Sequence, residues 1–528
     1  MGDILNPGYE KFKISLGSEN YVDKTMLLRE TNTLYNTERR FICVSRPRRF
    51  GKTMGANMLA AYYGSYVDSK KLFENFKIVN DTSFETYLNQ SNVLMVNIQE
   101  FLSLSSTVEE MIGFIKTSIT DEIAEAYPDL KFKAIDNFIQ VMKDTYRFTG
   151  KPFVILIDEW DCLLRENKED VDGHKDYLDF LRLWLKDQVY VGLAYMTGIL
   201  PIKKYGTQSA LNMFKEYSMT LPGRFQQFFG FTSFEVEQLC RENSMDFSEM
   251  KNWYNGYFVD SEQAIYNPKS VISALEDKKF SNYWSKTETF ETLRDYIQFD
   301  FDDLREKITI LLSGNAVRIE NETFVNDMTT FYSSDDILIL LVHLGYLAYY
   351  SETESVIIPN EEVKLEFVKS MKTLNWDNVI SAIKDSTALL NAIWDLDCES
   401  VASNLEKVHQ ENTAILNYND ENALSAIISL ALYAAKDYYT IIREFPAGKG
   451  FSDLVFIPRK KHLDKPALVV ELKWNKTAKS AIDQIKKKNY PAALDEYQGS
   501  LLLVAVNYDK KTKKHDCIIE SYNKAKDN

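Results

Sequence analysis

The stretch that decides the fold is FICVSRPRRFGKT, residues 41–53. Its first five residues form an apolar run typical of a buried strand, and a helical pattern follows the last one. Between them Gly51 lets backbone N–H groups turn inward around a phosphate, Lys52 reaches the terminal phosphates, and Thr53 places a hydroxyl on Mg²⁺. The N-terminus of the helix adds its partial positive charge at the same point. The order of strand, loop, G-K-T and helix predicts a phosphate-binding loop.

The standard pattern G-x-x-x-x-G-K-[ST] would place a glycine where this chain has Arg46, so a basic loop that merely closes a strand is the alternative. A second stretch, FVILIDE at residues 153–159, counts against that alternative. It is a buried strand that ends in two carboxylates. We expect Asp158 to hold Mg²⁺ and Glu159 to polarise water for attack on the γ-phosphate. Together the two stretches predict binding of ATP with Mg²⁺.

Apolar strand-like runs alternate with helical patterns through the first 230 residues, and this rhythm predicts a parallel sheet flanked by helices, an α/β fold. The runs are Phe41 to Ser45, Val93 to Asn97, Phe153 to Asp158 and Val191 to Thr197. Thr197 is either a polar sensor beside the γ-phosphate or a strand-end threonine packed on a turn.

Four regions are predicted along the chain: a P-loop core at 1–230, a helical lid at 231–330, a connector at 331–410 and a compact α/β unit at 411–528. In the connector, a helix at Asp335 to Leu344 precedes two short strands, as in a winged helix. The alternative is a helix and hairpin that pack between domains, because no basic cluster marks a recognition helix. Amphipathic helices are expected from 365 to 410.

In the C-terminal unit, Glu471 and Lys473 lie two apart on a predicted strand and should share one face, while Leu472 faces the core. A preceding strand that starts at Asp453 can run antiparallel and bring a second carboxylate beside Glu471. Two carboxylates suit Mg²⁺ or Mn²⁺, and Lys473 would position or activate water near a scissile phosphate. Glu421 is a further candidate acid. The alternatives are a solvated salt bridge for Glu471 with Lys473, and dipole complementation for Glu421.

These motifs resemble those of bacterial proteins that pair an AAA-ATPase-like domain with a C-terminal PD-(D/E)XK nuclease superfamily domain. The resemblance covers essentially the whole chain. It is carried by YVDKT at 21–25, SRPRRFGKT at 45–53, LIDEWD at 156–161, TG at 197–198, WYNGY at 253–257, YNP at 266–268, IPNEEV at 358–363, GKGFSD at 448–453 and VELK at 470–473.

The resemblance implies a P-loop sheet with a helical lid, a helical and winged-helix-like middle, and a restriction-endonuclease-like end. Arg46 is usual in this family, so its presence is compatible with ATP binding. Arg49 is expected to join the nucleotide site, with Asp23 and Lys24 near the nucleotide. In the nuclease-like part, Gln484 and Tyr490 are implied to line the site.

The charge distribution, the cysteines and the apolar runs indicate which partners and which cellular compartment to expect. The net charge is −15, yet residues 441–528 hold 18 Lys or Arg against 11 Asp or Glu. A basic end on an acidic body indicates either polyanion contact or a solvated lysine-rich surface. Five scattered cysteines without a C-x-x-C pair, and a start without a leader pattern, predict a cytoplasmic location. The longest apolar runs are shorter than the roughly 20 residues of a membrane span, so no membrane contact is expected.

The prediction is an ATPase coupled to a metal-dependent nuclease that acts on DNA. One alternative is a nucleotide-dependent switch whose nuclease fold only binds DNA or a protein partner. Another is a scaffold in which neither site works. The sequence leaves the oligomeric state open, a homo-oligomer included.

Overall fold

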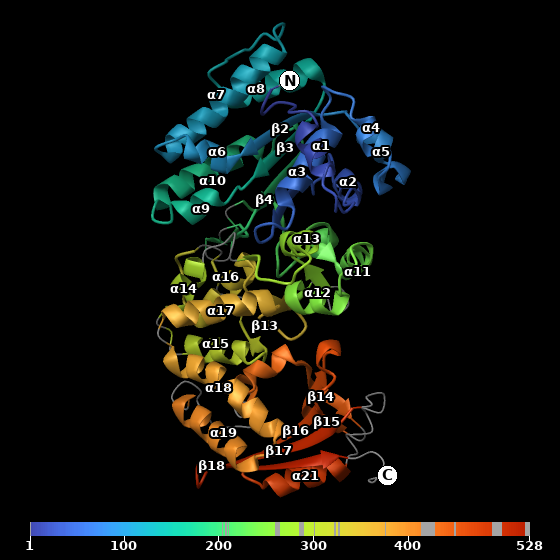
Figure 1. Cartoon of the computed structure of the whole chain (residues 1–528). Coiled ribbons are helices and arrows are strands. Elements are labelled where there is room, and N and C mark those ends of the chain that lie inside the picture. Colours follow the sequence, from blue (N-terminus) through green and yellow to red (C-terminus); the bar gives the residue numbers. More distant parts are fainter. Residues whose placement is uncertain are drawn as a thin grey trace. The chain divides into compact units, whose positions relative to one another are not determined.

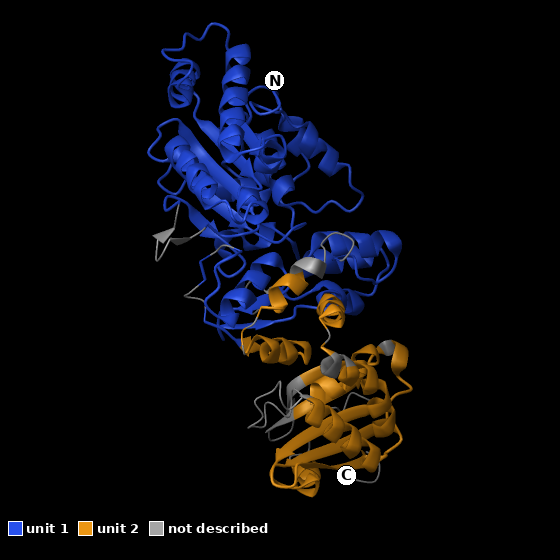
Figure 2. Ribbon diagram, turned by 90° about the vertical axis from the view of Figure 1, so that its left-hand side faces the viewer, with its two compact units in different colours: residues 1–288, 318–363 blue, residues 289–317, 364–528 orange. Residues whose placement is uncertain are grey.

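The computed structural model describes the chain except residues 1, 203, 206–207, 210, 259–263, 285–289, 300, 302, 321–323, 326–327, 375, 413–427, 448–449, 488–498 and 523–528. It divides into two compact units, 1–288 with 318–363 and 289–317 with 364–528 (Figure 2). The first unit contains the stretch at 41–53, and the second contains Asp453 and Glu471. The four regional boundaries proposed from the sequence stay a prediction.

A parallel sheet organises the first unit. Within its described part the strands are β1 (Phe41–Ser45), β2 (Asn92–Asn97), β3 (Phe153–Asp158), β4 (Val191–Gly198) and β7 (Lys215–Tyr217), in the order β2-β3-β4-β1-β7. The four longer strands lie where the apolar runs predict them, which confirms the α/β fold. The short edge strand β7 is not predicted, because its residues do not form an apolar run. A two-stranded ribbon joins β5 (Lys204–Tyr205) to β6 (Gln208–Ser209).

Helices cover both faces of this sheet (Figure 1). Side chains alternate along a strand, so in β3 Ile155 and Ile157 belong to one apolar core while Val154 and Leu156 belong to the other. The first core includes α6 (Ile98–Ser103), α7 (Val108–Ala126), α8 (Phe138–Thr149), α9 (Cys162–Glu166) and α10 (Val171–Leu185). The second includes α1 (Glu10–Leu16), α2 (Met26–Asn32), α3 (Lys52–Tyr63), α4 (Lys70–Phe73), η1 (Lys77–Asn80) and α5 (Phe84–Tyr87).

The lid follows η2 (Gly223–Phe228) and combines helices with a small sheet that the sequence does not predict. Its strands are β8 (Phe231–Thr232), β9 (Tyr257–Phe258) and β10 (Ala264–Tyr266), in the order β8-β10-β9, and its helices are α11 (Ser233–Glu242), α12 (Phe247–Tyr254) and α13 (Pro268–Asp277). Local sequence fixes the helix starts. Thr232 and Glu235 form a capping box on α11, and Asn267 caps α13 ahead of Pro268.

The loop after β1 is backed by residues far downstream. The Tyr257 ring packs edge-on against Phe50, with 5.2 Å between ring centroids, and its hydroxyl donates to Gly345 O at 2.8 Å. Gly345 has φ +88°, and a Cβ at this position would lie 2.8 Å from Pro47 Cβ. This close approach requires glycine, since any side chain would push against the loop.

The predicted helix and hairpin of the connector are present. They are α16 (Ser334–Leu344) and the antiparallel pair β12 (Ala348–Tyr350) and β13 (Ser355–Ile357), preceded by β11 (Val317–Arg318). Residues 337–342 of α16 are completely buried. A helix that is apolar all round is a core element. The burial therefore favours the packing alternative over an exposed recognition helix.

The second unit joins helices to a mixed sheet. The helices are α14 (Phe290–Ile297), α15 (Leu304–Leu312), α17 (Glu361–Thr373, whose first turn belongs to the first unit), α18 (Asp377–Trp394), α19 (Cys398–Asn412), η4 (Tyr433–Asp437), η5 (Lys460–His462) and α21 (Ala478–Lys487). The strands are β14 (Tyr439–Ala447), β15 (Gly450–Pro458), β16 (Ala467–Trp474), β17 (Leu501–Asp509) and β18 (Lys514–Tyr522), in sequence order. All neighbours are antiparallel except β16 and β17, which α21 connects in parallel.

Both faces of this sheet are covered. The core under α21 contains Val469 of β16 with Leu503 and Ala505 of β17. By alternation Tyr508 points to the opposite face, where it contacts His409 of α19. Residues on either face of the central strands are therefore buried.

Two buried histidines face each other on the α19 side. His409 Nδ1 lies 3.3 Å from His515 Nε2, and the Tyr508 ring packs against both. Burial lowers the pKa of His409 to about 4. Burial and the facing His409 lower the pKa of His515 to about 3.

These histidines should make the second unit acid-sensitive. Their folded pKa values lie below the ordinary value of 6.5, so the neutral pair stabilises the fold above pH 6.5, and this contribution falls as the pH drops from 6.5 toward 3. At about 1.4 kcal/mol per pKa unit, the loss is on the order of a few kcal/mol per histidine. We expect the urea midpoint to fall between pH 7 and pH 5 by less in His515→Gln than in wild type. The partly exposed His462→Gln should behave as wild type, and an equal fall in His515→Gln would contradict the assignment.

Among the described helices, none combines the length and the apolar character that a membrane span requires.

Candidate functional sites

The predicted phosphate loop lies at the carboxyl end of β1, where the chain passes directly into α3. Gly51 has φ +89° and Arg49 has φ +69°, both in the left-handed region. α3 begins at Lys52, two residues earlier than the sequence pattern suggests. Backbone N–H groups at the start of a helix are the ordinary ligands of a phosphate group in such loops.

Arg46 fills the position of the usual first glycine without entering the loop. Its guanidinium is buried and donates through Nη1 to Ser45 O and Tyr217 O, both at 2.8 Å. Burial lowers the pKa of Arg46 to about 10. The side chain ties the loop to β7, so this departure from the common motif leaves the phosphate side of the loop unobstructed.

Lys52 is buried beneath the loop. Its ammonium donates to Arg46 O and Pro47 O, both at 3.0 Å. Burial lowers the pKa of Lys52, while the nearby carboxylates of Glu159 and Asp158 oppose this effect. The ammonium thus lies between the loop carbonyls and the acidic end of β3.

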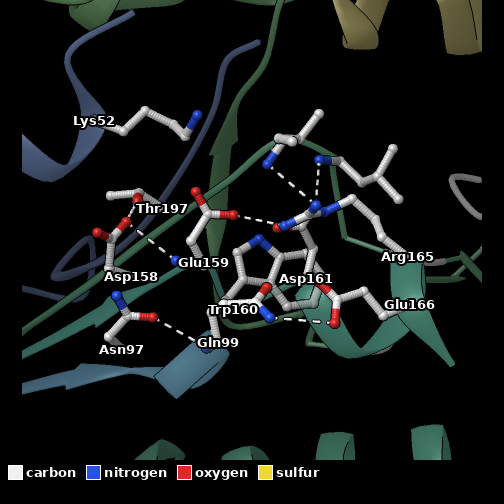
Figure 3. A network of polar contacts seen from close by, with 12 residues as sticks. Lys52, Asn97, Gln99, Asp158, Glu159, Trp160, Asp161, Arg165, Glu166 and Thr197 are labelled. Atoms are coloured by element: carbon white, nitrogen blue, oxygen red, sulfur yellow. Dashed lines mark hydrogen bonds and ion pairs between the residues drawn. The ribbon is translucent and has the colours of Figure 1, made fainter. Parts of the chain in front are cut away.

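Asp158 is the centre of a polar cluster at the carboxyl ends of β1, β3 and β4 (Figure 3). Its Oδ2 accepts from Thr53 Oγ1 at 2.6 Å, and its Oδ1 accepts a short hydrogen bond from Thr197 Oγ1. Thr197 therefore contacts Asp158, as a residue packed at the end of its strand does. Carboxylate and hydroxyl oxygens are the protein ligands that Mg²⁺ prefers, so Asp158 and Thr53 fit this ion.

Glu159 continues the cluster toward solvent, with a strained backbone at φ +52°. Burial raises the pKa of its carboxyl group. Its Oε2 accepts from Arg165 Nη2 at 2.6 Å, and Arg165 Nε donates to Asp161 Oδ2 at 3.1 Å. Neither Arg165 nor Asp161 is a site residue in the sequence prediction. The spacing of Asp161 and Arg165, one helical turn apart beside Glu159, is the signal that could have found them.

A cavity of about 540 Å³ opens in front of this cluster. Such a volume fits a nucleotide-sized ligand. At one end it is lined by residues 48–55 and Glu159; elsewhere the lining is largely apolar, with Phe12, Tyr21, Val22, Leu27, Met58, Phe228, Phe231 and Ile272. The start of α13, with Lys269, also faces the cavity. One end of the cavity is thus polar and the rest largely apolar.

The two other predicted nucleotide residues have structural contacts. Lys24 lines the cavity and binds both oxygens of Glu235, at 2.8 and 2.6 Å, so it joins the N-terminal segment to the lid helix α11. Asp23 Oδ1 accepts from Thr25 N and Oγ1, and its Oδ2 accepts from Lys77 N. Asp23 shapes a turn and is not among the described residues of the cavity wall.

In the second unit the predicted acids come together. β15 runs antiparallel to β16 and pairs Leu454 with Val470; one residue further in the same register, Asp453 comes opposite Glu471, as expected. Directly opposite residues have Cβ atoms roughly 5 Å apart. Asp453 Oδ2 accepts from Leu472 N at 2.7 Å, and Lys473 Nζ donates to Glu471 Oε1 at 2.8 Å.

The surroundings of Glu471 differ in one respect from the expectation. Leu472 is buried, as predicted, but Glu471 and Lys473 are buried as well, since α21 covers their face. Gln484 of α21 donates a short hydrogen bond to Glu471 Oε1. The structure therefore places Gln484 beside Glu471 and Lys473.

Glu421 and Tyr490 lie outside the described residues. Among the residues that the structure describes, no group of three or more His, Cys, Asp or Glu side chains is arranged to hold a metal ion. Asp453 and Glu471 are two oxygen donors, not three. A pair of oxygen donors fits a hard divalent cation that keeps several waters.

Two family models match different parts of the chain. Residues 8–207 match the model of a family described as predicted AAA-ATPase. Residues 419–517 match the PD-(D/E)XK nuclease superfamily. The chain joins an AAA-ATPase-like domain to a PD-(D/E)XK nuclease superfamily domain. The resemblance drawn from the motifs is thereby confirmed.

Similar proteins add little about activity. An uncharacterized protein in the vnfD 5′ region of Azotobacter chroococcum mcd 1 is 24% identical over 283 residues. The match covers 51% of this chain and 51% of that protein, so the chain spans about half the length of the curated relative it matches.

Three solved structures show a remote likeness. Cdc6p from Pyrobaculum aerophilum has a TM-score of 0.23 at 11% identity, covering 66% of this chain and 92% of its own. The Aeropyrum pernix ORC2 protein, in ADPNP-ADP complexes, has 0.30 at 11%, covering 67% and 97%. The Aeropyrum pernix ORC1 protein in complex with DNA has 0.25 at 12%, covering 70% and 98%. The AAA-ATPase-like fold therefore rests on the strand order and the family match.

Proposed function

We propose that the AAA-ATPase-like domain binds ATP with Mg²⁺ and hydrolyses it. The observation that carries this proposal is that Lys52, Thr53 and Glu159 line one end of a cavity of about 540 Å³, where Thr53 donates to Asp158 behind them. Lys52 and the loop N–H groups would hold the phosphates, while Thr53 and Asp158 would hold Mg²⁺. The ion would neutralise phosphate charge when bound. Glu159 would orient the attacking water, with Thr197 positioning Asp158.

The test is equilibrium binding and turnover of ATP by the full-length protein. Fluorescent ATP should bind in the presence of Mg²⁺, and phosphate release should follow. Asp158→Ala should weaken Mg²⁺-dependent binding, because it removes the acceptor of the Thr53 hydroxyl and the carboxylate that would hold the ion. Nucleotide binding that is absent in wild type and variant alike would refute the proposal.

We further propose that the nuclease superfamily domain cleaves a phosphodiester in DNA with Mg²⁺ or Mn²⁺. Asp453 and Glu471 would hold the ion, which would supply an activated water. Lys473, fixed by its ion pair to Glu471, would stabilise the scissile phosphate. Glu421 and Tyr490 remain candidate members of the site from the sequence.

A lysine surface at the same end of the sheet supports a polyanionic substrate. It consists of Lys476, Lys479, Lys510, Lys511, Lys513 and Lys514, all exposed. The parallel pairing of β16 and β17 places Lys473 beside Asn507, and the lysine turn follows a few residues later. Two hydrogen bonds fix the two segments together: Lys510 N to Asn475 Oδ1 at 2.8 Å, and Lys476 N to Asn507 Oδ1 at 2.9 Å.

Neutralising part of the lysine surface should weaken DNA binding. In Lys511→Gln/Lys513→Gln, the slope of log affinity against log salt should become less negative by about 0.9 for each phosphate contact that is lost. Titration of labelled duplex DNA at several salt concentrations measures the slope. Lys131→Gln/Lys133→Gln is the matched control, because it removes two exposed lysines of the same spacing from the first unit. Equal slopes in wild type and both variants would contradict the role of this surface.

A nucleotide-dependent switch with a non-cleaving nuclease fold is the second candidate. It is favoured by the burial of Glu471 and Lys473, which are 1% and 7% exposed and joined in an ion pair. Lys473→Ala separates the two functions. A cleaving enzyme should lose metal-dependent nicking of supercoiled DNA, while the switch should keep its DNA binding and show no nicking in either form.

The proposed setting is the cytoplasm. The five cysteines are all free, which suits a reducing compartment. We also propose that the protein forms a homo-oligomer, which size-exclusion chromatography with light scattering, with and without ATP, tests.

A further inference from the structure

A chain of three charged side chains runs from the cavity into the protein. Arg165 Nη2 binds Glu159 Oε2 at 2.6 Å, and Arg165 Nε binds Asp161 Oδ2 at 3.1 Å. The side chains become less exposed along the chain: Glu159 25%, Arg165 7% and Asp161 0%. An ion pair between side chains this buried is much less screened by solvent than a surface pair.

Arg165 reaches Glu159 from the protein side. Glu159 lines the cavity, whereas Arg165 is not among the described residues of its wall. In Figure 3 the Glu159 carboxylate lies between Lys52 on one side and Arg165 on the other. The guanidinium binds one carboxylate oxygen, so the ion pair fixes the direction of the group while Glu159 still faces the cavity.

Asp161 anchors the arginine to the end of β4. The same Asp161 Oδ2 accepts from Ile199 N at 3.1 Å and from Leu200 N at 2.8 Å. Packing here is tight, because a Cβ on Gly198 would lie 2.4 Å from Asp161 Oδ1. The direction of the Glu159 carboxylate is therefore tied to the segment that follows Thr197.

We propose that Arg165 is a positioning residue for ATP hydrolysis: it holds the Glu159 carboxylate in the direction needed to orient the attacking water. This inference rests on the proposed ATPase function. Glu159 has a strained backbone at φ +52° and sits at the edge of the cavity, so its side chain needs a second support. A misplacement of a catalytic group by about 1 Å can cost about 10²-fold in rate.

The test combines a kinetic split with a double-mutant cycle in the full-length protein. Arg165→Gln should lower the single-turnover rate of ATP hydrolysis by about 10²-fold, with the Kd for fluorescent ATP changed less than about threefold. Arg165→Lys should recover part of the rate, because an ammonium can bind Glu159 but cannot bridge to Asp161 as a guanidinium does. In a Glu159→Gln background, Arg165→Gln should cause almost no further loss.

The outcomes separate this inference from the ATPase proposal. A wild-type protein that neither binds nor hydrolyses ATP refutes both. If the wild type is active, an equal loss from Arg165→Gln with and without Glu159 overturns the positioning role and leaves a purely structural one. If thermal melting shows that Arg165→Gln folds poorly, Arg165→Lys replaces it in the double-mutant cycle with Glu159→Gln. The expected loss in hydrolysis rate is then smaller. Arg147→Gln, which removes a different ion pair of the same unit, serves as the control.

Discussion

A Lys52→Ala protein should bind ATP about 10 to 10² times more weakly than wild type and hydrolyse it about 10² to 10³ times more slowly. The ammonium is buried and donates to two loop carbonyls, and Lys52 lines the predicted phosphate end of the cavity. Its removal takes away the charge that would hold the terminal phosphates. Binding of fluorescent ATP and release of phosphate measure the two effects separately.

Lys71→Ala is the matched control, because Lys71 is exposed on the short helix α4 and does not line the cavity. Thermal melting of both variants shows whether the fold survives. Unchanged ATP binding in a well-folded Lys52→Ala protein would mean that the nucleotide, if any, binds elsewhere.

The second large effect is expected for Asp453→Asn, which should lower metal-dependent DNA cleavage by about 10²-fold or more. An asparagine keeps the size of the side chain and its acceptor for Leu472 N, but loses one charged metal ligand. This variant is cleaner than a change at Glu471. There, the buried ammonium of Lys473 would lose its partner, at a cost of roughly 3–5 kcal/mol.

Nicking of supercoiled DNA at a series of Mn²⁺ and Mg²⁺ concentrations measures the effect. Asp464→Asn, an exposed aspartate of the same unit, should cleave as wild type does. Cleavage by Asp453→Asn at the wild-type rate would place the activity at another site, or in a contaminant.

Most of the sheet of the first unit follows from local sequence. The apolar runs that became β1 to β4 are long and bounded by turns, so their type and order can be predicted from periodicity alone. The edge strands β7 and β18 are different. Their residues alternate or are partly polar, and only pairing with the neighbouring strand, β1 or β17, makes them strands.

The sites are predicted where chemistry is local and missed where it depends on packing. Thr53 and Asp158 belong to recognisable stretches, and the period of a strand correctly places Glu471 and Lys473 on one face. The role of Arg46 depends on β7, which lies far away in the sequence. The contact of Arg165 with Glu159 is likewise not predictable from the sequence, because it depends on the turn after β3.

The contact of Tyr257 and Gly345 with Phe50 and Pro47 bears on how such a chain could have been assembled during evolution. A recombination event at about residue 230 would separate the loop from the residues that back it, and would expose apolar surface on both products. We therefore expect the segment from β1 to the β12–β13 hairpin to be inherited as one block. The nuclease superfamily domain, whose strands pair among themselves, is the part that could be exchanged between lineages.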